Sequence, residues 1–131
     1  MTKQKSKVLK FLVVDDNEVS RLLLYTVLGQ MGYSADQVDN GEDACKMASK
    51  NSYDIIMMDL QMPDMDGVEA TENMRKKGVT TPIVAMLANN TESDKSRALR
   101  AGIRHFISKP IYRDKLERQL RDRIFPDVII S

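Results

Sequence analysis

The feature that most constrains the fold of this chain is a strict alternation of short apolar runs with segments of helical periodicity. Five segments of strand length span 8–14, 33–38, 55–58, 83–88 and 103–108, and the first, third and fourth of them are rich in Val, Ile, Leu and Met. Strands that alternate with helices form a parallel sheet joined by right-handed crossovers, with helices on both faces. The sequence therefore predicts an α/β fold with a doubly wound, five-stranded parallel sheet and five helices.

The first three helical segments carry recognisable start and stop signals. Apolar residues recur at every fourth position of the first segment, which predicts the buried face of a helix ending before Gly32. These residues are Val19, Leu23, Val27 and Met31. Asn40 is expected to cap the second helix, and Gly78 to close the third, over 68–77.

The last two helical segments differ in their apolar content. Thr91 is expected to cap the fourth, in which Ala98 and Leu99 are nearly the only apolar residues. This helix is therefore predicted to be weakly anchored and mobile. The fifth ends at Pro126 and is anchored by three residues: Leu116, Leu120 and Ile124.

Length and composition favour one globular domain. A chain of 131 residues with 42% hydrophobic and 30% charged residues suits a single domain with a core over 8–124, a basic tail over 1–7 and a C-terminal tail over 125–131. The apolar runs are too short to span a membrane, so no membrane insertion is expected. The single Cys45 and the lack of a secretory segment indicate a reducing, cytoplasmic setting, or a nuclear one in a eukaryote.

Charge is unevenly distributed along the chain. The net charge is +1, which gives the whole molecule no general attraction to nucleic acid. Residues 95–123 contain ten lysines and arginines against three acidic residues, so this segment carries +7 and the remainder −6. Such a run is usually a solvated surface, but it would also favour an acidic protein partner.

Charged side chains follow three of the predicted strands. Asp15 and Asp16 come after the first strand, Asp59 after the third and Lys109 after the fifth. In the flavodoxin-like strand order 2-1-3-4-5, the first and third strands are neighbours, and ligands bind where the strand order reverses. Each residue alone could be a helix cap or an ordinary surface charge. Together they predict a crevice in which three carboxylates require cationic compensation.

The donor atoms in this crevice favour Mg²⁺, which prefers hard oxygen ligands. One His and one Cys are too few for a zinc site, and Met62 occupies the first ligand position of an otherwise EF-hand-like stretch. A carboxylate-held metal beside an exposed aspartate and a lysine suits phosphoryl transfer, with Asp59 as the nucleophile. The lone His105 is expected to be structural or exposed.

Three ordered motifs resemble those of the response regulator receiver domain of two-component signalling and phosphorelays. They are LVVDDN at 12–17, MDLQMPDMDG at 58–67 and SKP at 108–110, and the resemblance spans about 8–124. It implies a phosphoacceptor domain that is not an enzyme in its own right. Its expected phosphodonor is a histidine kinase or a histidine phosphotransfer protein.

The resemblance also implies roles for individual residues. Asp59 is expected to be the phosphoacceptor, with Lys109 pairing with the phosphorylated carboxylate across a cis bond to Pro110. Asp16, Asp59 and the Gln61 backbone carbonyl are expected to bind magnesium, and Asp15 to act largely through water. Gln61 and Asn89 occupy the positions that are expected to modulate the lifetime of the phosphoryl group.

One position departs from the family pattern. In PIVAMLAN at 82–89, Leu87 stands where the family carries Thr or Ser, whose hydroxyl binds a phosphoryl oxygen. Phe106 matches the aromatic residue whose rotamer responds in the family. A missing charge-assisted hydrogen bond costs about 1.5 to 3 kcal/mol, so the switch is expected to weaken while the chemistry survives. Leu87 is also expected to fill an apolar gap beside Phe106.

Several functions remain open at the level of sequence. The alternatives are a degenerate receiver that serves as a constitutive docking module, a metal-dependent phosphohydrolase with an aspartyl nucleophile, and a flavin-binding domain. The acidic first loop opposes a flavin phosphate. A downstream protein is expected to bind the face formed by 92–123. The sequence leaves open the oligomeric state and whether the domain is free-standing or part of a hybrid kinase.

Overall fold

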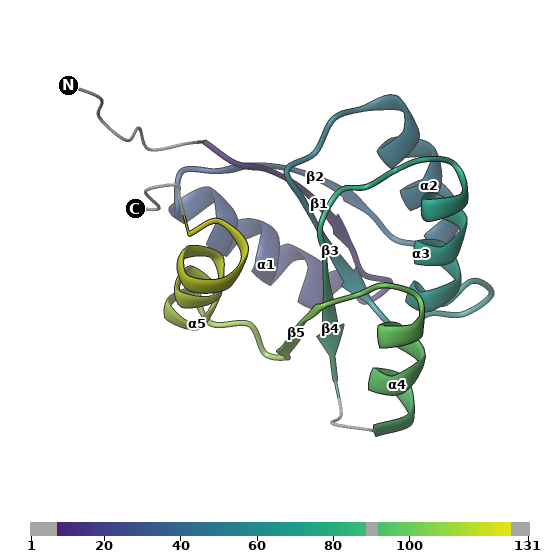
Figure 1. Cartoon of the computed structure of the whole chain (residues 1–131). Coiled ribbons are helices and arrows are strands. Elements are labelled where there is room, and N and C mark those ends of the chain that lie inside the picture. Colours follow the sequence, from purple (N-terminus) through teal and green to yellow (C-terminus); the bar gives the residue numbers. More distant parts are fainter. Residues whose placement is uncertain (1–7, 89–91, 127–131) are drawn as a thin grey trace.

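The computed structural model of the chain describes residues 8–88 and 92–126, which form a parallel sheet covered by helices on both faces (Figure 1). The strands are β1 (Lys10–Val14), β2 (Ser34–Val38), β3 (Ile55–Asp59), β4 (Ile83–Leu87) and β5 (His105–Ser108). The helices are α1 (Glu18–Gln30), α2 (Gly41–Lys50), α3 (Gly67–Lys76), α4 (Glu92–Arg100) and α5 (Arg113–Gln119). A π-helical turn, η1 (Leu120–Ile124), follows α5.

The strand order is β2-β1-β3-β4-β5 and every neighbouring pair is parallel, which confirms the predicted doubly wound fold. Helices α1 and α5 cover one face of the sheet, while α2, α3 and α4 cover the other (Figure 1). In the pairing of β1 with β3, Val14 lies beside Met58. The next residues along the two strands, Asp15 and Asp59, therefore emerge next to each other at the carboxyl edge of the sheet.

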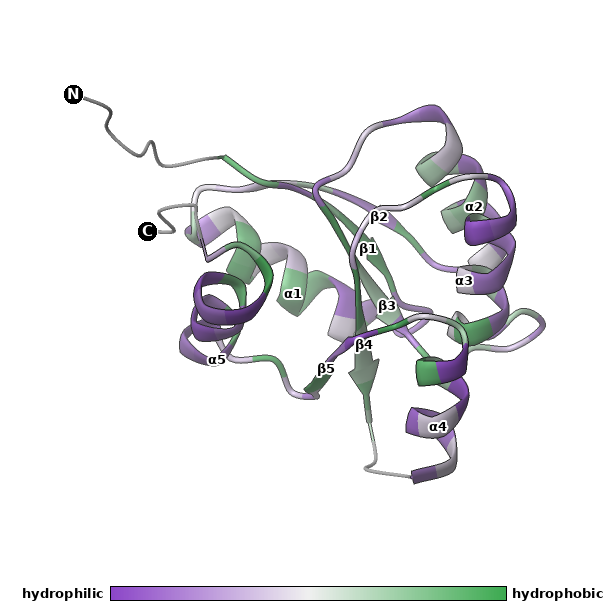
Figure 2. Cartoon of the chain, in the orientation of Figure 1, coloured by the Kyte–Doolittle hydropathy of each residue, from purple (hydrophilic) through white to green (hydrophobic). Residues whose placement is uncertain are grey.

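The sheet separates two apolar cores. Alternate residues of each strand face opposite sides, so Leu12 and Ile56 pack toward α2 and α3, while Phe11 and Ile55 pack toward α1 and α5. All four side chains are fully buried. Figure 2 shows apolar strands at the centre and hydrophilic residues on the outer faces of the helices. Within the described residues, no helix combines the length and hydrophobicity needed to cross a bilayer.

The prediction for α1 was wrong about which face is buried. Val19 and Leu23 are 68% and 60% exposed, whereas Leu24 and Leu28 make the contact with the sheet. Residues four apart advance by more than one helical turn, so a row with that spacing drifts by about 40° at each step. Met31, which ends the predicted row, is again buried. The first half of the row consequently faces solvent.

The end of α5 also differs from the prediction of a regular helix reaching Pro126. Leu116 and Leu120 are buried, as expected, but the chain widens into η1 after Gln119. The amide of Phe125 donates to the Leu120 carbonyl over 2.7 Å, closing the wider turn. The predicted cap at Thr91, the tail over 1–7 and residues 127–131 of the C-terminal tail lie outside the described residues.

Gly67, the first residue of α3, allows this helix to approach the end of β3 closely. A Cβ at this position would clash with the carbonyl oxygen of Asp59 and would lie 2.9 Å from Leu60 Cα. Replacing Gly67 with Ala is therefore expected to lower the free energy of unfolding by about 1 to 3 kcal/mol, measured by urea denaturation.

Gly29 provides the matched control, because a Cβ there would meet nothing within 4 Å. Gly29→Ala removes a helix-disfavouring residue from α1 and is expected to raise the free energy of unfolding by up to about 1 kcal/mol. Equal stability of the two variants would contradict the close approach inferred for Gly67.

Candidate functional site

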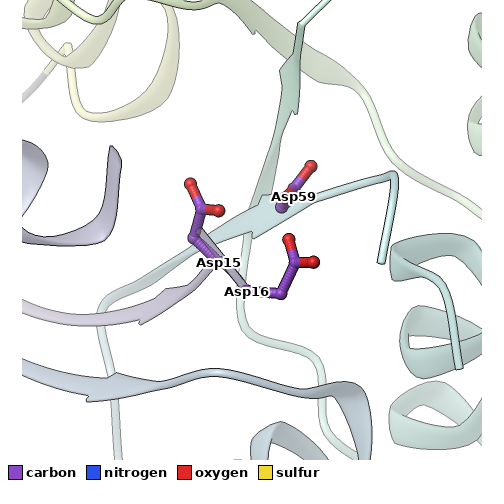
Figure 3. Close-up of side chains that lie close together, drawn as sticks. All are labelled: Asp15, Asp16 and Asp59. Atoms are coloured by element: carbon purple, nitrogen blue, oxygen red, sulfur yellow. The ribbon is translucent and has the colours of Figure 1, made fainter. Parts of the chain in front are cut away.

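Three carboxylates meet at the carboxyl edge of the sheet. Asp15 and Asp16 directly follow β1, and Asp59 is the last residue of β3; Figure 3 shows their side chains gathered at the ends of these strands. One ligand oxygen from each lies within 4.8 Å of the others. Asp15 and Asp59 are almost completely buried and Asp16 is exposed. The site thus concentrates negative charge at a place that remains open to solvent on one side.

Lys109 provides the cationic side chain at this site. Its Nζ lies 2.8 Å from Asp15 Oδ2 and 3.5 Å from Asp59 Oδ2. The Lys109 amide donates to the carbonyl oxygen of Leu87 over 2.8 Å, which fixes the start of the loop after β5. The bond from Lys109 to Pro110 is cis, as expected. With one ammonium group against three carboxylates, the cluster retains negative charge and attracts a further cation.

The two buried carboxylates have opposite pKa shifts. Burial raises the pKa of Asp59 to about 7 from its ordinary value of 3.8; Lys109 and the Gln61 amide oppose this shift, and the charge of Asp15 adds to it. Burial would also raise the pKa of Asp15, but Lys109 and the Asn17 amide outweigh it and lower the pKa. In the absence of a second cation, Asp15 therefore carries the more stable charge and Asp59 is only partly ionised near neutral pH.

The donor set fits a hard divalent cation. All three side chains offer carboxylate oxygens, and the buried Asp15 Oδ2 makes no hydrogen bond of good geometry although Lys109 is near. Within residues 8–88 and 92–126, this is the only group of at least three acidic, His or Cys side chains placed closely enough to hold a metal ion. Asp15, Asp16 and Asp59 are therefore the residues that could bind Mg²⁺ here.

The loop from β3 to α3 holds its shape through backbone and capping interactions. The Gln61 amide donates to Asp59 Oδ1 over 3.1 Å. Asp64 adopts a φ of 66°, a left-handed conformation that Asp tolerates better than most residues. Asp66 caps α3 in a reciprocal capping box with Glu69. These contacts keep Gln61 beside the Asp59 carboxylate, whereas Asn89 lies outside the described residues.

Two long-range contacts join this loop to α4. Gln61 Nε2 donates to Asp94 Oδ2 over 3.1 Å, and Arg97 Nη2 lies 3.0 Å from Asp66 Oδ2. Of the two apolar residues noted in this helix, Ala98 is buried and Leu99 is 48% exposed. The sequence did not predict that polar side chains also hold α4 to this loop. Contacts between exposed side chains some thirty residues apart leave no periodic pattern in the sequence.

Leu87 and Phe106 occupy the positions assigned to a conformational switch. Leu87 is 4% exposed in the core that faces α2 and α3, and the partly buried Phe106 packs against this core. Leu87 thus fills apolar space, as expected, and has no hydroxyl to offer to the site. The carbonyl of Phe106 accepts a hydrogen bond from Gln119 Nε2 over 3.1 Å.

An apolar groove adjoins the carboxylates on the α1 side. It has a volume of about 630 Å³, and both Asn17 and Lys109 border it. Its apolar lining includes Val19, Leu23, Pro110 and Tyr112. The groove could not be predicted as long as Val19 and Leu23 were assigned to the buried face of α1. The four-residue spacing of these apolar positions could have indicated it, because a row with that spacing turns away from the buried face and leaves apolar side chains exposed.

The fold and the acidic cluster define the class of the protein, a flavodoxin-like domain with a candidate metal site at the carboxyl edge of its sheet. The profile of the response regulator receiver domain matches residues 11–121. The chain belongs to this family. It is 40% identical over 109 residues to the sensor histidine kinase RcsC of Salmonella typhi, a match that covers 83% of this chain and 12% of that kinase. It is 39% identical to the rice two-component response regulator ORR41, covering 84% of this chain and 90% of that protein.

Solved receiver structures have the same architecture. The receiver domain of the sensor histidine kinase PA1611 from Pseudomonas aeruginosa PAO1, solved with magnesium in its active site cleft, gives a TM-score of 0.80 at 33% identity and covers 88% of this chain and 96% of that one. The Mg²⁺-bound receiver of the histidine kinase CKI1 from Arabidopsis thaliana gives 0.77 at 31% identity, covering 92% of each chain. The protein is thus a receiver of the kind found in two-component and phosphorelay systems.

The raised pKa of Asp59 predicts how stability depends on pH. Between pH 3.8 and about 7 the folded protein keeps a proton that the unfolded chain has lost, so this stabilising contribution is complete at low pH and is lost as the pH rises through about 7. In metal-free buffer, Asp59→Asn is expected to raise the free energy of unfolding by roughly 2 kcal/mol at pH 8 and to change it little at pH 4.

Asp64→Asn is the matched control, because Asp64 is exposed and Asn also tolerates its backbone conformation. Its effect on urea-induced unfolding should be small, as for most substitutions of exposed side chains. A gain for Asp59→Asn that is equal at both pH values would show that burial of the Asp59 charge is not its cause.

Proposed function

We propose that this receiver accepts a phosphoryl group on Asp59 from a phosphohistidine protein in a magnesium-dependent reaction, and signals by conformational change. The observation that carries the proposal is the convergence of Asp15, Asp16, Asp59 and Lys109 at one end of the sheet. The magnesium-bound receiver structures of the related kinases support the choice of ion.

In the proposed reaction, a carboxylate oxygen of Asp59 attacks the phosphorus. The new O–P bond forms as the N–P bond of the donor breaks, and the electron pair stays on the histidine nitrogen. Asp16, Asp59 and the Gln61 carbonyl would hold magnesium, with Asp15 acting through water, and the ion would neutralise the charge of the phosphoryl oxygens. Only the ionised Asp59 can attack, so Lys109 promotes the reaction by stabilising that form.

After transfer, Lys109 is positioned to pair with the phosphorylated carboxylate. Its Nζ already lies 3.5 Å from Asp59 Oδ2, and the contact to Asp15 restrains the ammonium group on the other side. We assign Gln61 and Asn89 to control of phosphoryl lifetime, since Gln61 lies next to Asp59 along the loop. The domain would assist only its own phosphorylation and dephosphorylation.

The phosphodonor is proposed to dock in the groove along α1. A donor histidine must come into contact with Asp59, and Lys109 and Asn17 line both the site and the groove. The exposed Val19 and Leu23 suit the apolar surface of a helix that carries the histidine. A histidine kinase or histidine phosphotransfer protein has the required chemistry, and a downstream protein is proposed to bind the face formed by 92–123.

The relatives show receivers in two settings. The chain spans about 12% of the length of the sensor histidine kinases that it matches, and 90% of the rice response regulator. The proposed role is therefore compatible with a domain of a hybrid kinase and with a free-standing regulator. The buried Leu87 favours a second candidate function, a receiver that docks to its partner regardless of phosphorylation.

Phosphorylation is tested by incubating the protein with acetyl phosphate and magnesium and reading its intact mass. The wild-type protein is expected to gain one phosphoryl group, and Asp59→Asn none. Asp64→Asn, a charge-matched change in the same loop, should label as the wild type does. Chelating magnesium should suppress labelling, and labelling of Asp59→Asn to the wild-type extent would contradict the assignment of the phosphoacceptor.

The weakened switch is tested by restoring a hydroxyl at position 87. On phosphorylation, hydrogen exchange over 88–102 is expected to change little in the wild type and several-fold more in Leu87→Thr, because a charge-assisted hydrogen bond contributes about 1.5 to 3 kcal/mol. Leu87→Val is the control, since it has the shape of threonine without the hydroxyl. A full response in the wild type, or equal responses of the two variants, would refute a switch limited by Leu87.

A further inference from the structure

Arg21, in the first turn of α1, reaches back to the loop that carries Asp15 and Asp16. Its Nη1 donates a hydrogen bond of 2.8 Å to the carbonyl oxygen of Asp15. Its Nε donates to Gln37 Oε1 on β2 over 3.2 Å. A single guanidinium group therefore ties together three segments of the chain: the loop after β1, the helix that follows it and the edge strand beside it.

The half-buried Arg21 has acidic neighbours but does not pair with them. Asp39 and Asp43 border the same hollow of about 300 Å³ as Arg21, yet within the part of the chain that the structure describes Arg21 forms no ion pair. The two carboxylates instead accept hydrogen bonds of 2.7 and 2.9 Å from Asn40 Nδ2. Arg21 thus serves as a donor to neutral oxygens rather than as a partner in a salt bridge.

The carbonyl held by Arg21 belongs to the peptide bond between Asp15 and Asp16, two of the three carboxylates gathered in Figure 3. Asp15 is also fixed by other contacts, since its amide donates to the Val38 carbonyl over 3.2 Å and its Oδ1 accepts from the Asn17 amide over 2.9 Å. The exposed Asp16 lacks such support, because among the described residues its carboxylate has no hydrogen-bond or ion-pair partner. Its place in the cluster therefore depends on the backbone just before it.

We propose that Arg21 is a positioning residue for metal binding, which fixes the peptide bond before Asp16 and so holds the Asp16 carboxylate in the cluster. Gln37 restrains the guanidinium group from the other side. This rests on the proposed function in taking a divalent cation as the ligand of the three carboxylates. A planar guanidinium suits the role, because it offers several donors in fixed directions. Groups that orient metal ligands without touching the metal strongly affect its affinity.

The test is the affinity of Arg21→Gln for Mg²⁺, measured by calorimetric titration without a phosphodonor. Removal of a cation near three carboxylates would, through charge alone, tighten the binding of Mg²⁺. Loss of positioning has the opposite sign, and an increase in Kd of about tenfold is expected. Arg21→Lys keeps the charge but loses the planar set of donors, so it should also raise the Kd.

Gln37→Met tests the second contact, because methionine keeps the length of the side chain and offers only a weak acceptor. It should raise the Kd for Mg²⁺ by a smaller factor than Arg21→Gln. In the double variant it should add little, since both changes release the same guanidinium group. If urea denaturation shows that Arg21→Gln is not fully folded, Arg21→Lys and Gln37→Met decide the outcome.

Lys50→Gln is the matched control, because it makes the same change in net charge at an exposed residue at the end of α2. Its Kd should stay within about twofold of the wild-type value, since salt screens distant surface charges. Metal binding is read without a phosphodonor, so it decides this proposal even if Asp59 accepts no phosphoryl group. In acetyl phosphate labelling, Arg21→Gln should need more magnesium for its half-maximal rate and reach the wild-type rate at saturation.

Three results would overturn the proposal. The first is a Kd for Mg²⁺ in Arg21→Gln and Arg21→Lys that is equal to or lower than that of the wild type. The second is an increase of the same size in Lys50→Gln, which would indicate an effect of net charge alone. The third is strict additivity of the changes at Arg21 and Gln37, which would mean that the two residues act through separate contacts.

Discussion

The contact of Lys109 with Asp15 and Asp59 is the interaction on which the rest of the site depends. Two carboxylates buried side by side would each have a raised pKa and would oppose folding if both were charged. The ammonium group holds the charge on Asp15 and only partly offsets the burial of Asp59, whose pKa remains at about 7. Lys109 alone therefore compensates only part of the negative charge of the site, and a bound cation would favour the ionised form of Asp59.

The fold places these charges, and much of that placement could be predicted from sequence. Apolar runs that end in Asp15, Asp59 and Lys109 determine which side chains emerge at the carboxyl edge, and the strand order β2-β1-β3 makes the first two neighbours. The parts that escaped prediction depend on tertiary contacts. The buried face of α1 is set by packing of Leu24 and Leu28, and the η1 turn has no local signature in the sequence.

The same loop that holds Asp59 also contacts α4 directly. Gln61 reaches Asp94, and Asp66 joins the α3 cap to Arg97, so changes at the carboxylate have a physical route to α4 that does not pass through residue 87. These contacts are weak because their side chains are exposed to solvent, and surface ion pairs contribute at most about 1 kcal/mol to stability. Under the switching role proposed above, the buried Leu87 and this weak polar link would both favour a modest conformational response.

Magnesium affinity tests this electrostatic account most directly. It is measured by calorimetric titration at about pH 9, above the pKa of about 7 that burial gives Asp59. Asp16→Asn removes an exposed ligand and should weaken binding about tenfold or more, whereas Lys109→Met removes a competing positive charge and should tighten it. Weaker binding in Lys109→Met, or unchanged binding in Asp16→Asn, would contradict a cluster in which the lysine and the metal ion neutralise the same three carboxylates.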